Sequence, residues 1–151
     1  MTRIIVAFIG SLCPALLLNV ERKNLLWAGL AGMLGRLLND WLLALYPNAA
    51  LVSVFLGTAA VAIYSEVMAR LRKTPSTIFS IPGVFPLVPG VDAYRTIQSL
   101  TEADYSAATS FGVSAVAKAS LIAFSILIVS SVFRKITLNR NRKAQITDHT
   151  T

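Results

Sequence analysis

Four long apolar runs constrain this chain more than any other feature of its sequence. They cover residues 4–20, 25–46, 49–68 and 107–133. A helix needs about 20 apolar residues, within a range of roughly 17–25, to cross the hydrocarbon of a bilayer. Charged residues make up only 14% of the chain, against about 25% in a soluble domain. A water-soluble fold would expose apolar surface that nothing covers, so the pattern predicts an all-α integral membrane protein.

The first run resembles a signal peptide in length but not in its flanks. It has no small-x-small cleavage site, and Glu21, Arg22 and Lys23 follow it directly. More positive charge follows the run than precedes it. We therefore expect an uncleaved helix whose N-terminus lies outside.

Residues 74–100, between the third and last runs, read TPSTIFSIPGVFPLVPGVDAYRTIQSL. The segment is long enough to cross, but its internal prolines each remove a backbone donor and clash with the preceding turn. Freed backbone groups at membrane depth have to be buried in protein or face a water-filled cavity. The sequence thus predicts a broken helix that either crosses the membrane or re-enters.

Positive charge decides between crossing and re-entry. Most of the 14 Lys and Arg residues cluster at 22–23, 70–73 and 134–143, and such clusters face the cytoplasm. If the broken segment crosses, all three clusters lie inside and Glu102 and Asp104 lie outside. We therefore predict five transmembrane helices, the fourth broken by Pro and Gly, with the N-terminus out and the C-terminus in. Residues 1–138 form the membrane domain, and residues 139–151 form a polar, basic, disordered cytoplasmic tail.

Several chemistries are excluded by composition. Cys13 is the only cysteine and His149 the only histidine, so neither a metal site of the usual kind nor a catalytic triad can be assembled. The positive charge follows membrane topology rather than a nucleic-acid-binding surface. We expect no enzyme activity, no cofactor and no nucleic-acid partner.

The broken segment is the most specific functional signal. Discontinuous membrane helices build transport sites, because their N-termini present unpaired N–H groups. Pro86, Pro89 and Gly90 should end one helix, with Gly90 at positive φ, and a new helix should begin near Val91. The N–H groups of residues 91–93 would then be free to hold a carboxylate.

Three further residues belong to this predicted site. Asp92 falls in the first turn of the new helix, where a carboxylate is favoured, and Tyr94 and Arg95 follow to contact the rest of a substrate. The alternative is a kinked helix with a purely structural role.

Arg36 lies near the middle of the second run, where a charge costs at least about 2.5–3.5 kcal/mol. It either binds a substrate carboxylate or forms a structural ion pair with Asp40 or Asp92. A Gly-x-x-Gly-x-x-Gly pattern at residues 29–35 precedes it and predicts close approach of a neighbouring helix.

Lys118 lies in the outer half of the last run. It belongs to a polar stripe at helical spacing that is able to line a path. The alternative, which we favour, is that Lys118 reaches up to the outer headgroups. The stripe consists of Ser110, Ser114, Lys118 and Ser125.

The chain resembles the small subunit of the two-component threonine/serine exporter family (ThrE-type), a stand-alone version of that exporter's C-terminal half. The resemblance covers nearly the whole chain. It rests on the succession of apolar runs, on Trp27 followed by Gly32 and Gly35, and above all on Phe85-Pro86-Leu87-Val88-Pro89-Gly90 with Tyr94 after it.

The resemblance implies export of small hydrophilic metabolites across a bacterial inner membrane. The substrates implied are threonine and serine, or small dicarboxylates such as succinate. It also implies a larger partner subunit, and we expect self-association as well. Two other functions stay open: a structural subunit that only stabilises its partner, and a passive channel.

Overall fold

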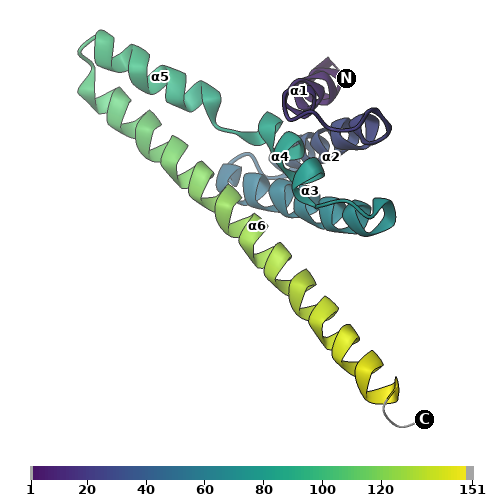
Figure 1. The fold of residues 1–151 in the computed structure, drawn as a ribbon. Helices are drawn as coiled ribbons and strands as arrows, with labels where there is room; N and C mark the ends of the chain where they lie inside the picture. Colours follow the sequence, from purple (N-terminus) through teal and green to yellow (C-terminus); the bar gives the residue numbers. More distant parts are fainter. Residues whose placement is uncertain (1, 149–151) are drawn as a thin grey trace.

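The computed structural model describes the backbone of residues 2–148 and the side chains of residues 3–136. Four helices form a bundle, and two more form an arm that projects from it (Figure 1). In the bundle, α2 is central and packs against α1, α3 and α4. In the arm, α5 packs on the first part of α6, and α6 continues past α3. The elements are α1 (Thr2–Leu17), α2 (Arg22–Leu45), α3 (Ala50–Arg72), α4 (Thr77–Val84), the 3₁₀ turn η1 (Phe85–Leu87), α5 (Gly90–Thr101) and α6 (Tyr105–Asp148).

Glycines let the bundle helices approach closely. A Cβ added to Gly35 of α2 would lie 2.4 Å from a methyl of Val61 on α3, and one added to Gly57 would lie 3.0 Å from the Gly35 carbonyl oxygen. A Cβ on Gly32 would overlap the Ser11 hydroxyl of α1. The close approach predicted from the glycine pattern is thus confirmed, on both sides of α2.

Local sequence sets the helix ends. Pro47 disfavours a helical conformation at Tyr46, which has φ −132° and ψ 82° where α2 ends. Lys73 closes α3 in the left-handed conformation, with φ 53°. The N–H groups of Lys73 and Thr74 both donate to the Ala69 carbonyl, which satisfies an acceptor at the helix end.

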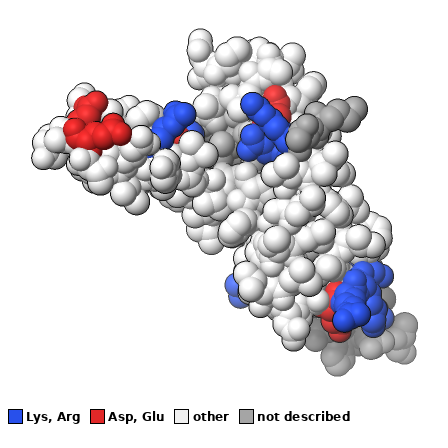
Figure 2. Space-filling view, turned by 90° about the horizontal axis from the view of Figure 1, so that it is seen from above, with Lys and Arg blue, Asp and Glu red and all other residues white. Residues whose placement is uncertain are grey.

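Two arginine side chains at the end of α3 reach the other two segments that carry basic clusters. Arg72 donates to the Asn24 side chain and to the Lys23 carbonyl. Arg70 donates to the Phe133 carbonyl of α6 and lies over the Phe133 ring. The clusters expected on one side of the membrane therefore lie at one end of the molecule. Figure 2 shows an acidic group at one tip and a mainly basic group at the opposite end, with smaller groups of charged side chains on the surface between them.

Fewer helices than expected meet a simple test for a membrane span. Among the described residues, two helices are long and apolar enough, 50–72 and 105–136, while residues 3–17 and 77–87 form shorter apolar helices. The first run is short because α1 ends at Leu17, and α2 carries Arg36 and Asp40, which lower its hydropathy. Two of the four apolar runs thus give a helix that meets this test. The number of spans and their direction stay predictions.

The C-terminal segment extends α6. The helix continues to Asp148, well into the segment 139–151 that we predicted as a disordered tail. Residues 149–151 lie outside the described residues. The boundary between membrane domain and tail stays a prediction.

Candidate functional site

The broken segment leaves the helical conformation at Val88 and Pro89. Val88 is extended, with φ −58° and ψ 132°, because a residue before proline avoids the helical region. Pro89 is the N-cap of α5, which begins at Gly90, one residue before the predicted start. Asp92 lies in the first turn of α5, as predicted. The break therefore separates α4 and η1, which belong to the bundle, from α5, which belongs to the arm.

A cavity of about 210 Å³ lies beside this break. Polar side chains from three helices reach it: Arg36 and Asn39 from α2, Asp92 from α5 and Lys118 from α6. The rest of the lining is apolar or proline: Leu43, Ala50, Val54, Pro86, Leu87, Val88, Pro89 and Val91.

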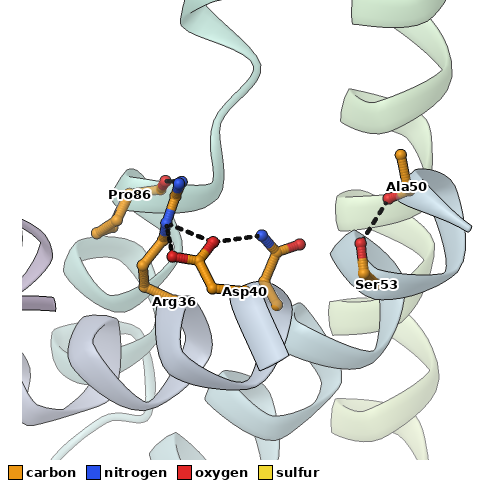
Figure 3. Close-up of polar contacts among 6 residues, drawn as sticks. Arg36, Asp40, Ala50, Ser53 and Pro86 are labelled. Atoms are coloured by element: carbon orange, nitrogen blue, oxygen red, sulfur yellow. Dashed lines mark hydrogen bonds and ion pairs between the residues drawn. The ribbon is translucent and has the colours of Figure 1, made fainter. Parts of the chain in front are cut away.

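Arg36 is paired within its own helix and also contacts the broken segment (Figure 3). Its Nε lies 3.1 Å from Oδ1 of Asp40, one turn on. Its Nη1 donates to the Pro86 carbonyl oxygen at 3.5 Å. Of the two structural partners considered from the sequence, Arg36 therefore has Asp40 and not Asp92. The remaining guanidinium donors are available to a ligand.

Asp92 is paired with the other cation of the cavity. Its Oδ2 accepts hydrogen bonds from Lys118 Nζ and from Ser114 Oγ, both on α6. The two charged side chains are largely buried, at 22% exposed for Lys118 and 17% for Asp92. Our preference for a Lys118 that reaches the headgroups was wrong, because the nearest countercharge lies on the helix packed against it.

The polar stripe of α6 also makes a second contact. Ser125 Oγ donates to the Phe55 carbonyl of α3 at 3.1 Å. Ser114, Lys118 and Ser125 thus lie on the side of α6 that faces the protein, first α5 and then α3, whereas Ser110 is exposed.

Two predicted site residues lie away from the cavity. Tyr94 is 67% exposed, and the Arg95 guanidinium lies over the Phe111 ring of α6, 5.5 Å from its centroid. Neither lines the cavity, because α5 turns them to its other sides. Contact of these two residues with a substrate stays a prediction, and it would have to occur outside this cavity.

The backbone at the start of α5 differs from expectation in two respects. No glycine in the described residues has positive φ, and a Cβ on Gly90 would meet nothing within 4 Å. The Ala93 N–H donates to the Pro89 carbonyl at 3.1 Å. Ala93 is therefore not a free donor, which leaves the first-turn N–H groups of residues 91 and 92 for a ligand.

A second cavity of about 370 Å³ adjoins the first. Arg36 and Pro86 line both, so their contact lies at the boundary between the two. The second cavity opens towards α1, through Val6, Ala7 and Gly10. No three His, Cys, Asp or Glu side chains in the described part of the chain are grouped to hold a metal ion.

Asn39 was missed by the sequence analysis. It is buried, at 5% exposed, and lines the first cavity. The sequence feature that pointed to Asn39 was a polar amide within an apolar run, but only its charged neighbours were considered as site residues.

Comparison with known proteins identifies one family. The family described as "Threonine/Serine exporter, ThrE" matches residues 3–132. No curated protein matches the chain, and no solved structure does.

Proposed function

This chain belongs to the threonine/serine exporter family, and on that premise we propose that it is the small membrane subunit of an exporter of small hydrophilic metabolites, acting with a larger partner subunit. Family membership makes the chain a membrane transport protein and not an enzyme. The proposal adds the partner, the substrate range and the position of the site. The substrates are threonine- or serine-type amino acids, or small dicarboxylates.

One observation carries the assignment of the site. The cavity beside the broken helix gathers Arg36, Asp92 and Lys118 from three separate helices. Charged side chains within membrane segments are costly and usually mark a substrate or ion pathway. A discontinuous helix beside them is the arrangement in which transporters bind small polar molecules.

The basic residues at one end of the molecule support a five-span arrangement. Basic residues near 23, 72 and 134 lie at one end of the molecule, which the positive-inside rule assigns to the cytoplasm. The 46–49 turn and the α5–α6 turn then lie towards the outside. In this arrangement α4, η1 and α5 together form the fourth, broken span.

Exposed apolar surface on the α5–α6 arm supports the proposal of a partner subunit. Only 11% of the most apolar stretch of α6 is buried, and α5 packs mainly on α6. Lipid covers such a surface in part. A larger subunit against the arm would also bury the N–H groups of residues 91 and 92, which have no intrahelical partner and which lipid is unable to satisfy.

The assignment of the site is tested by accessibility. In a variant with Cys13 replaced by Ser, single cysteines at Val88, Val91 and Asp92 should react with a small water-soluble thiol reagent in membranes containing both subunits. Millimolar threonine or succinate should slow that reaction. A matched cysteine at Phe124, a residue on the exposed side of α6, should be unaffected by either substrate.

The alternatives give different results. A structural subunit gives labelling that no substrate changes, and efflux that persists without this chain. A passive channel gives labelling together with downhill flux only. Efflux of labelled substrate that needs both chains, with substrate-dependent labelling at Val91, supports the exporter.

A further inference from the structure

Asn39 has a buried hydrogen-bond acceptor that the protein does not use. Its side chain is 5% exposed, and its Nδ2 donates to Oδ1 of Asp40 at 3.4 Å. Its Oδ1 has no hydrogen-bond partner among the described residues. The orientation of the amide follows from charge, because the reverse would put two oxygens together at the Asp40 carboxylate.

The residue that carries this unused acceptor lines the cavity that contains Arg36. Asn39 follows Arg36 by three residues on α2, so the two lie on neighbouring parts of one helix face, and both line the cavity. A buried acceptor without a donor costs about 1–3 kcal/mol, so a ligand donor at this position would bind favourably.

The charge balance of the site indicates what kind of donor fits. Arg36 is paired with Asp40, and Lys118 with Asp92, so the four groups sum to no net charge. A zwitterion enters such a site without adding net charge. A dicarboxylate would bring two negative charges to cations that are already neutralised, and one carboxylate would lie against the bare Asn39 oxygen.

We propose that Asn39 is a specificity-determining residue, whose Oδ1 accepts an N–H of the substrate ammonium while the free guanidinium donors of Arg36 hold the substrate carboxylate. The proposal rests on the proposed function, namely that this cavity binds the transported molecule. It adds a residue that selects amino acids against dicarboxylates and against analogues without the amino group. Selection arises because a substrate lacking the donor leaves a buried acceptor unpaired.

The test compares threonine with its analogue in which a hydrogen atom replaces the amino group (3-hydroxybutyrate), and with succinate. Competition against labelled threonine is measured in membranes that contain this chain and its larger partner. The wild-type protein should prefer threonine over both competitors. In Asn39→Leu this preference should fall about tenfold or more, as expected for a hydrogen bond to a charged group.

A second variant separates loss of the acceptor from misfolding. Asn39→Asp keeps an oxygen at the same position and adds negative charge, so it should retain or increase the preference for threonine over succinate. Preference is a ratio within one sample, and therefore does not depend on the amount of folded protein. Unchanged preference in Asn39→Leu, or a wild-type protein that favours succinate, would overturn the proposal while leaving the exporter function intact. A wild-type complex that binds and transports none of the three compounds would overturn both.

Discussion

The charge of Arg36 is neutralised within its own helix, which explains how a cation is tolerated far from both ends of α2. The Asp40 carboxylate lies one turn on, and the Pro86 carbonyl takes a further N–H. That carbonyl is free because the chain leaves the helical pattern at η1. Arg36 therefore links the proposed site to the broken segment, and both the structural and the substrate-binding interpretation of this residue are compatible with its contacts.

Replacing Arg36 by Gln should weaken substrate binding. A hydrogen bond to a charged group contributes about 1.5–3 kcal/mol, so the half-saturating concentration of substrate should rise at least about tenfold. The measurement is efflux of labelled threonine from cells that contain both subunits, with the amount of protein in the membrane quantified alongside. Arg22→Gln, at the basic end of the bundle, is the matched control with the same change in charge. A half-saturating concentration that is equal in the two variants would place the carboxylate site elsewhere.

At the scale of elements, glycines bring α2 and α3 into close contact. Gly57 of α3 lies against the Gly35 carbonyl, and a backbone atom is unable to move aside as a flexible side chain does. Small residues at such a contact are what allow helices to associate in a membrane, where apolar surface alone gives no preference for protein over lipid.

Gly57→Val should destabilise the protein. Overpacking of a close contact typically costs about 1–3 kcal/mol, which should lower the midpoint of thermal unfolding in detergent by several degrees. Gly10→Val is the control, because a Cβ at Gly10 meets nothing within 4 Å. If the two variants unfold at the same temperature, the helices are further apart than the structure indicates.

The contact between α5 and α6 depends on a pair of charges. Asp92 and Lys118 should show a coupling energy of about 0.5–3 kcal/mol in a double-mutant cycle built from Asp92→Asn and Lys118→Met. Either single change leaves a partly buried charge without its partner. The sum of the two single destabilisations should therefore exceed the destabilisation of the double variant. The readout is thermal unfolding of the purified protein. The exposed pair Glu21–Lys23, 3.8 Å apart, serves as a reference and should give coupling near zero.

Sequence reasoning found the features that are local in the chain. Proline geometry predicted the break at residues 86–89, and dipole reasoning predicted Asp92 in the first turn of a new helix. Glycine spacing predicted a close helix contact. Each of these depends on neighbours within a few residues, which the sequence contains.

The features that it missed depend on which helix faces which. Lys118 was assigned to the headgroups because nothing in the spacing of one helix tells that Asp92 of another lies opposite. Asn39 was overlooked for the same reason, since its importance comes from a cavity that α3, α5 and α6 complete. The positive φ expected at Gly90 failed because Val88 and Pro89 make the turn with conformations open to any residue.

At the scale of the whole molecule, charge is distributed along one axis. Basic groups lie at one end, and the α5–α6 turn with Glu102 and Asp104 lies at the other tip (Figure 2). Between them the surface is mostly uncharged, and smaller groups of charged side chains interrupt it. The arrangement fits a molecule oriented across a membrane with its acidic tip outside.

Cysteine labelling tests this orientation directly. In the Cys13→Ser background, an impermeant thiol reagent applied from outside should modify single cysteines at Asn48 and Glu102. It should fail to modify cysteines at Lys73 and Lys135 until the membrane is opened. Modification of Lys135→Cys from outside would contradict the five-span arrangement and favour a broken segment that re-enters.

Each of the two ion pairs near the cavity lies wholly on its own side of the break. Arg36 and Asp40 belong to α2 in the bundle, whereas Asp92, Ser114 and Lys118 belong to the α5–α6 arm. Separating opposite charges in a medium of low dielectric constant is costly. If the arm swings at Val88 and Pro89 while each body keeps its own pair, the two walls move apart without parting any charge from its countercharge, and the electrostatic barrier to that motion is small.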